Sequence, residues 1–132
     1  MRTNKRVCAI IIRENKILMI HRKKRGFEFW IVIGGGVEDT ETLEEALIRE
    51  VKEETSCEVI QYEKRYSFKE AKKQHYFYTC TLKQTDVTLA GPEFESNSAQ
   101  NSFKLEWVDL EKLPTLNMYP HSILEALKKM PI

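Results

Sequence analysis

The spacing of hydrophobic residues changes once within residues 27–56, and this change constrains the fold most. Residues 27–33 (FEFWIVI) are rich in aromatic and β-branched side chains, which is typical of a β-strand, and three consecutive glycines follow them. From residue 42 to residue 56, apolar residues instead recur at helical spacing. The residues with this spacing are Leu43, Ala46, Leu47 and Val51. The sequence therefore predicts a strand that stops at a glycine loop, followed by one helix of about 14 residues.

Further elements are expected on both sides of this unit. Thr42 and Glu45 have the spacing of a capping box, which marks the start of the helix. Polar residues 83–102 predict a mobile loop, and Pro120 is expected to open a closing helix. The order of elements predicts a single domain over residues 1–132 of α/β (α+β) class, with a mixed sheet flanked by helices. Besides 27–33, the expected strands are 6–12 and 16–22, paired as a hairpin, and 57–68, 74–82 and 104–110.

Composition excludes several classes of partner. The chain has 132 residues and a net charge of +1 at pH 7, which gives no general reason to bind a nucleic acid polymer or a membrane. No apolar stretch approaches the roughly 18 residues that a membrane span needs. The three cysteines are far apart and form no CxxC pair, which argues against a disulfide framework and a zinc site and favours a reducing, cytoplasmic location. They are Cys8, Cys57 and Cys80.

Three glutamates lie close together in REVKEET, residues 49–55. At about 100° per residue, Glu53 and Glu54 lie about 60° and 40° to either side of Glu50 on a helix. Carboxylates that converge in this way suit Mg²⁺ or Mn²⁺, which also bind substrate phosphate oxygens. A solvated acidic helix face is the alternative explanation. The nearby Arg49 and the glycines before the helix favour the metal site.

Residues 35–57 (GGVEDTETLEEALIREVKEETSC) resemble the Nudix box, and the resemblance covers most of the chain. Two positions depart from the pattern: Ser56 replaces a glycine that closes the helix, and Cys57 replaces an aliphatic residue. The resemblance implies a Nudix-type α/β/α sandwich. The residues at matching positions are Gly35, Glu41, Arg49, Glu50, Val51, Glu53 and Glu54.

The resemblance also implies hydrolysis within the pyrophosphate of a nucleoside diphosphate linked to another group. By position, the metal ligands would be Glu50, Glu53, Glu54 and the Gly34 carbonyl. Arg49 would fix the carboxylates by pairing with them, Glu41 among them. Glu53 is the first choice for the general base and Glu50 the second.

Residues outside the helix are expected to contact the substrate. Arg22 stands where similar proteins place an arginine on a phosphate, although a solvated basic turn is the alternative for the run HRKKR. Backbone groups of Gly35 and Gly36 can approach a phosphate closely. Glu93, rather than Glu95, is the candidate from the long loop, although a solvent-facing carboxylate is the alternative.

The expected substrates are small nucleotides, with nucleoside triphosphates, including oxidised or non-standard ones, preferred over nucleotide sugars. The protein is expected to act as a monomer or a homodimer. A nucleotide sensor or partner-binding module that has lost turnover is the alternative function. The intact set of Arg49, Glu50, Glu53 and Glu54 favours the enzyme.

Overall fold

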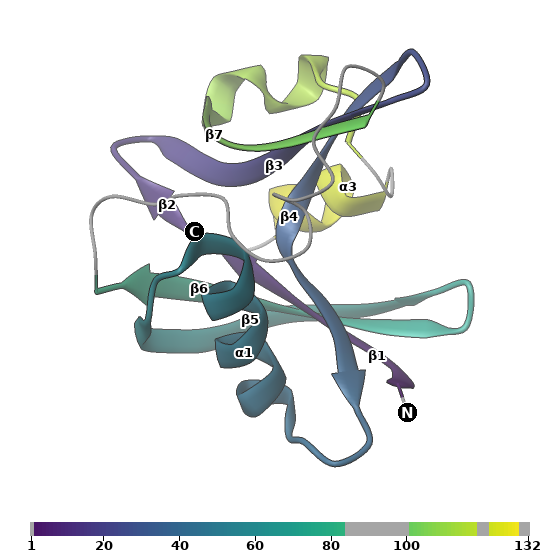
Figure 1. The fold of residues 1–132 in the computed structure, drawn as a ribbon, viewed down its shortest axis with the longest axis vertical. Coiled ribbons are helices and arrows are strands. Elements are labelled where there is room, and N and C mark those ends of the chain that lie inside the picture. The colour runs from purple at the N-terminus through teal and green to yellow at the C-terminus, as the bar shows by residue number, and fades with distance from the viewer. Residues whose placement is uncertain (1, 84–100, 119–121, 130–132) are drawn as a thin grey trace.

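A seven-stranded mixed sheet with helices packed on both faces forms the protein (Figure 1). The structure is a computed structural model that describes residues 2–83, 101–118 and 122–129. In chain order the elements are β1 (Arg2–Ile10), β2 (Ile12–Arg13), β3 (Lys16–Lys24), β4 (Phe27–Glu38), α1 (Leu43–Thr55), β5 (Val59–Glu70), β6 (Lys73–Leu82), β7 (Asn101–Asp109), the 3-10 helix η1 (Leu110–Thr115) and α3 (Ser122–Lys129).

Strand β1 occupies the middle of the sheet. The strand order is β2-β3-β4-β1-β6-β5, and β7 pairs with β3. β1 runs parallel to β6 and antiparallel to β4, while the other pairings are antiparallel. In Figure 1, β4 extends from the β3–β7 part of the sheet to the β1–β6 part, so this one strand joins the two parts.

Two apolar cores lie on opposite faces of the sheet, because side chains alternate along a strand. Val7 and Ala9 of β1 pack in the core that contains Leu47 of α1. Cys8 and Ile10, which alternate with them, pack in the core that contains residues of η1 and α3. The predicted fold class, a mixed sheet flanked by helices, is confirmed.

The predicted hairpin of residues 6–12 and 16–22 is wrong in its main pairing. The chain is buried from Val7 to Ile11, so this strand lies inside the sheet between two partners and not at a hairpin edge. Only the two-residue strand β2 pairs with the start of β3 in a hairpin. The turn between them uses Glu14 and Asn15, both with positive φ.

The prediction of a glycine loop is also wrong, because residues 34–36 lie inside strand β4 and pair with β1. Gly34 has a φ of +149°, and an added Cβ there would collide with the backbone oxygen of Val7. An added Cβ at Gly35 would lie 2.5 Å from Cδ of Glu50. The glycines therefore permit close approach of β1 and α1 to one continuous strand.

Most other predicted elements are present in the structure. β5 and β6 form an antiparallel hairpin near the predicted strands 57–68 and 74–82, and β7 covers most of 104–110. Helix α3 begins at Ser122, while Pro120 and residues 84–100 of the long loop lie outside the described residues. The three cysteines are buried and lie outside any disulfide. No helix among the described residues is long and apolar enough to span a membrane.

Both ends of helix α1 follow from its sequence. The Glu45 amide donates to the Thr42 hydroxyl at 3.1 Å, and the Thr42 amide donates to the Glu45 carboxylate at 2.8 Å, so the predicted capping box is present. Ser56 ends the helix in the left-handed region with φ 63° and ψ 14°. This conformation is the one for which a glycine is favoured.

Replacing Ser56 with glycine is therefore expected to stabilise the protein. A side chain in the left-handed region costs about 1 kcal/mol, and glycine removes that cost at the expense of a more flexible unfolded chain. We expect Ser56→Gly to raise the free energy of unfolding by about 0.5 kcal/mol in urea titrations. Ser56→Ala keeps the Cβ atom and serves as the control, and an equal gain in that variant would contradict the explanation.

Candidate functional site

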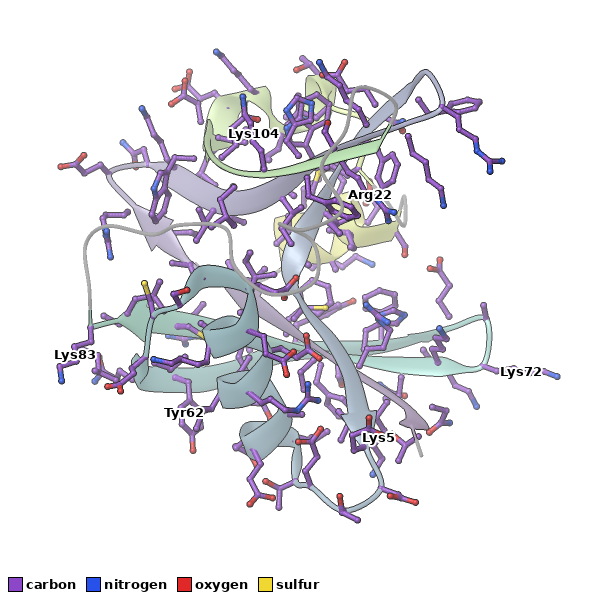
Figure 2. All side chains as sticks on the ribbon, in the orientation of Figure 1. Lys5, Arg22, Tyr62, Lys72, Lys83 and Lys104 are labelled. Atoms are coloured by element: carbon purple, nitrogen blue, oxygen red, sulfur yellow. The ribbon has the colours of Figure 1, made fainter. Side chains whose placement is uncertain are left out.

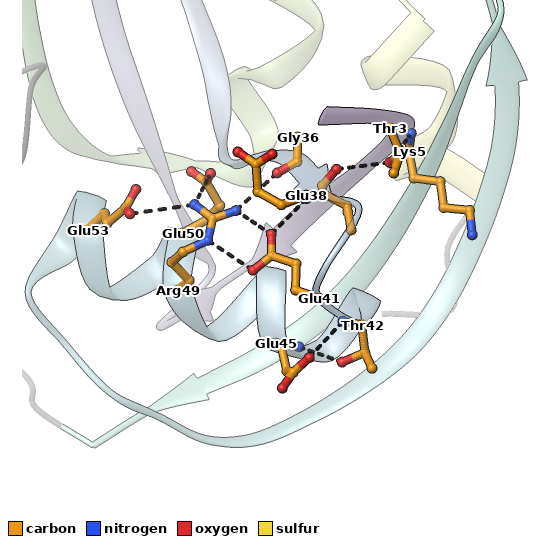
Figure 3. Close-up of polar contacts among 11 residues, drawn as sticks. Thr3, Lys5, Gly36, Glu38, Glu41, Thr42, Glu45, Arg49, Glu50 and Glu53 are labelled. Atoms are coloured by element: carbon orange, nitrogen blue, oxygen red, sulfur yellow. Dashed lines mark hydrogen bonds and ion pairs between the residues drawn. The ribbon is translucent and has the colours of Figure 1, made fainter. Parts of the chain in front are cut away.

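Arg49 lies at the centre of a network of carboxylates on and before helix α1 (Figure 3). Its Nε and Nη2 donate to the two oxygens of Glu41 at 3.1 and 2.6 Å. Its Nη1 donates to Glu50 at 2.8 Å and to Glu53 at 3.5 Å. Its Nη2 also donates to the backbone oxygen of Gly36 at 3.1 Å. The guanidinium therefore holds the start of α1 against strand β4.

These contacts fix both the charge and the position of Arg49. The hydrogen bonds to Glu41 raise the pKa of Arg49 above its ordinary value, with a further contribution from Glu50. Glu41 is itself held, because its Oε1 accepts the backbone amide of Glu38 at 2.9 Å. A lysine could not reproduce this arrangement, since its ammonium lacks the planar set of donors.

Glu50 and Glu54, one turn apart on α1, are buried against the glycines of β4. Their exposed fractions are 6% and 4%. Oε1 of Glu54 accepts the amide of Gly34 at 2.8 Å, and the Glu50 carboxylate occupies the space beside Gly35 where a side chain would lie. Burying a carboxylate is costly unless it is hydrogen-bonded. The two glutamates therefore do not form a solvated helix face.

Glu53 differs from these neighbours, because its side chain is 48% exposed. Glu53 shares Arg49 with Glu41 and Glu50, and Glu54 lies one turn along α1 from Glu50. Three carboxylates on one helix face have the chemistry that a hard divalent cation requires. They do not converge on one point, and no group of three His, Cys, Asp or Glu among the described residues is placed to hold a metal ion.

A cleft of about 770 Å³ lies next to this network, and Gly34 belongs to both. The Gly34 amide contacts Glu54, while Gly34 also lines the cleft. The basic residues that line the cleft, here called its basic rim, are Arg6, Arg22, Lys24, Arg25 and Lys73, and the acidic Glu70 lines it as well. Apolar and aromatic residues line much of the rest, among them Cys8, Phe27, Phe29, Val32 and Ile123. A basic rim around an apolar interior is suited to a ligand with both a phosphate and a ring.

Arg22 projects from strand β3 and lines this cleft (Figure 2). Its guanidinium lies 4.2 Å from the ring centroid of Phe103 and 5.7 Å from that of Phe29. Its Nε is buried without a hydrogen-bond partner among the described residues. Contacts with the two aromatic rings hold the guanidinium where its charge faces the cleft. Arg22 is therefore not part of a solvated basic turn.

The structure brings most of the predicted site residues together. Arg49, with Glu41, Glu50, Glu53 and Gly36, forms one hydrogen-bonded network. Glu54, Gly34 and Gly35 adjoin it, and Gly34 connects it to the cleft that Arg22 lines. Glu93 and the alternative Glu95 lie outside the described residues.

Sequence reasoning missed two residues of the cleft, Arg6 and His75. Arg6 belongs to a basic N-terminal segment, and a lone histidine is more often a structural residue. The parallel pairing of β1 with β6 places them side by side. No local pattern could have shown this, because the two strands are far apart in the sequence.

A family model supports the resemblance noted in the sequence. The model described as NUDIX domain matches residues 2–127. A relative named ADP-ribose pyrophosphatase, from Methanocaldococcus jannaschii, is 52% identical over 50 residues, which cover 37% of this chain and 30% of that protein. This chain spans less than a third of the length of the curated relatives that it matches.

Solved structures share the fold at low sequence identity. A MutT structure, from Aliivibrio salmonicida or Vibrio cholerae, has a TM-score of 0.74 at 19% identity and covers 94% of both chains. The NUDIX domain of Shewanella oneidensis NrtR, in complex with ADP ribose, has a TM-score of 0.66 at 18% identity and covers 94% of this chain and 85% of that one. At these identities the likeness establishes the fold alone.

Proposed function

The chain belongs to the Nudix family, and from this premise we propose that it is a divalent-metal-dependent pyrophosphohydrolase. Its substrate would be a nucleoside diphosphate linked to another group. One observation carries the proposal: the buried carboxylates of Glu50 and Glu54 lie against Gly35 and Gly34 of β4, and Gly34 also lines the basic cleft. Carboxylates for a cation and arginines for a phosphate are thus brought together at one strand.

The proposed cation is Mg²⁺ or Mn²⁺. Glu50, Glu53 and Glu54, with the Gly34 carbonyl, would hold it. Carboxylate oxygens are the preferred protein ligands of such a cation, so the chemistry of this donor set fits it, and the three side chains would have to converge when it binds. When bound, the cation would neutralise charge on the pyrophosphate and lower the pKa of a bound water.

The other roles fall to side chains whose contacts are known. Arg49 holds the Glu50 carboxylate, and Glu41 holds Arg49, so both are positioning residues. Glu53 is the proposed general base, because it is the most exposed of the three glutamates proposed to hold the cation and can reach an incoming water. Arg22 would neutralise the substrate phosphates in the cleft, which it lines together with Gly34. Backbone groups of Gly35 and Gly36, next to Gly34 on β4, are proposed to contact the phosphates.

Nucleoside triphosphates remain the proposed substrates. The basic rim supports an anionic substrate with several phosphates. The panel of nucleotides to be tested should also contain ADP-ribose, because a relative is named for its hydrolysis and a structural neighbour binds it. Nucleotide sugars complete the panel.

Turnover is expected to require the cation. We expect a nucleoside monophosphate to form from at least one of these substrates in the presence of Mg²⁺, and its formation to fall to the level of the buffer after chelation. Mn²⁺ should restore the activity. Nucleotide binding without turnover at any metal concentration would contradict the proposal and favour a nucleotide sensor.

A further inference from the structure

A row of paired residues crosses one face of the sheet, and two of its members, Arg6 and His75, line the cleft. Arg6 of β1 is paired with Gly36 of β4 on one side and with His75 of β6 on the other, and His75 is paired with Phe68 of β5. Directly paired residues point to the same face. Neighbouring strands lie about 4.8 Å apart, so His75 lies about 10 Å from Gly36 across the sheet. A ligand with its phosphates at the glycines would extend toward His75.

His75 has an unusual environment for a buried polar residue. Its side chain lines the cleft, although the residue is only 5% exposed. Its ring stacks on that of Phe68, with centroids 4.8 Å apart and an interplanar angle of 10°. Nδ1 is buried without a hydrogen-bond partner among the described residues. Buried polar atoms are rarely left unpaired, so this ring is placed to accept a partner from outside the chain.

The charge state of His75 argues against a phosphate as that partner. Burial lowers the pKa of His75 below its ordinary value, and the charge of Arg6 lowers it further. The imidazole is therefore neutral near pH 7, with one nitrogen that donates and one that accepts. Such a ring suits the edge of a nucleobase better than it suits a phosphate.

Arg6 supplies the complementary chemistry. It lines the same cleft beside His75, and its guanidinium offers hydrogen-bond donors and no acceptor. The apolar Cys8 and Ile123 also line this cleft, which favours a ring over a second phosphate group. Donors from an arginine match the paired O6 and N7 acceptors of guanine, whereas adenine presents an amino donor at position 6.

We propose that Arg6 and His75 are specificity-determining residues that read the edge of the nucleobase and favour a 6-oxopurine over adenine. The proposal deepens the proposed function and rests on it for the placement of the phosphates. It assigns no role in the chemical step to either residue. Its effect is therefore expected in affinity and KM, with kcat changed little.

Calorimetric binding of GMP, IMP and AMP to the full chain without metal tests the proposal. We expect the wild-type protein to bind GMP and IMP about tenfold more tightly than AMP. Arg6→Met should weaken the binding of GMP about 10- to 100-fold and the binding of AMP less than about threefold. His75→Phe keeps the stacking on Phe68 and should weaken GMP about tenfold through the lost hydrogen bond.

Lys5→Gln is the matched control for charge, because Lys5 is next to Arg6 on β1 but does not line the cleft (Figure 2). The affinities of Lys5→Gln for GMP, IMP and AMP should equal those of the wild type. Equal losses for GMP, AMP and inorganic pyrophosphate in Arg6→Met would identify a phosphate contact and overturn the proposal. Unchanged GMP affinity in a folded His75→Phe variant would overturn it too, as would a wild type without base preference.

The binding assay separates this proposal from the proposed function. Selective GMP binding that depends on Arg6 and His75, without hydrolysis of any nucleotide, would refute the enzyme and leave the base-reading pair in place. Metal-dependent hydrolysis of GTP and ATP with equal KM in the wild type and both variants would support the enzyme and refute the base-reading pair.

Discussion

Replacing Glu53 with glutamine is expected to lower kcat by about 10²- to 10⁴-fold, which is the usual contribution of a positioned general base. The amide keeps the size of the side chain but cannot accept a proton from water. Its contact with Arg49 is long, at 3.5 Å, and the side chain is 48% exposed. The free energy of unfolding should therefore change by less than about 0.5 kcal/mol. Initial rates at saturating nucleotide and Mg²⁺, together with urea titrations, measure both quantities.

Glu58→Gln is a suitable control for this substitution. Glu58 lies just after α1, is exposed, and has Lys83 at 3.8 Å as a surface partner. Its replacement should leave kcat unchanged. Near-normal turnover in Glu53→Gln would refute the assignment of Glu53. A larger loss in Glu50→Gln, in a variant whose fold is intact, would transfer the role of base to Glu50.

Replacing Gly35 with alanine is expected to inactivate the protein without unfolding it. The added Cβ would lie 2.5 Å from Cδ of Glu50 and 2.6 Å from both of its oxygens. The carboxylate is the end of a flexible side chain, so it should move before the backbone does. That movement breaks its contact with Arg49 and displaces a proposed metal ligand. A displacement of about 1 Å can cost about 10²-fold in rate, so we expect at least that loss in kcat/KM.

The stability of Gly35→Ala should fall by about 1–3 kcal/mol, the usual cost of overpacking. Gly26→Ala is the comparison, because a Cβ at Gly26 meets no atom within 4 Å although its φ is +85°. That variant should lose about 1 kcal/mol of stability through backbone strain and keep its activity. Full activity in a folded Gly35→Ala protein would show that the position of the Glu50 carboxylate is unimportant.

Local patterns in the sequence were sufficient for the helix and most strands. Thr42 and Glu45 mark the start of α1, and the spacing of its apolar residues predicts its buried face. The departure at Ser56 also had a local signal, because a helix that ends in the left-handed region favours glycine there. These features depend on interactions between residues a few positions apart, which a sequence displays directly.

Long-range pairing could not be predicted in the same way. The glycines of β4 suggested a loop, because glycine is the usual turn residue, but here the close approach of β1 and α1 requires them. The register between β1 and β6 decides that Arg6 lies beside His75. Nothing near either residue records that register. The carboxylate network is intermediate: helical spacing places the glutamates together, but the burial of Glu50 and Glu54 depends on β4.

Gly34 has a consequence for how two ligands would influence each other. Its amide is bound by Glu54, while the same residue lines the cleft. A nucleotide that shifts this peptide would change the position of Glu54, and an ion that draws Glu54 away would free the amide. The affinities for cation and nucleotide should therefore be thermodynamically linked, and each ligand must alter the binding constant of the other by the same factor.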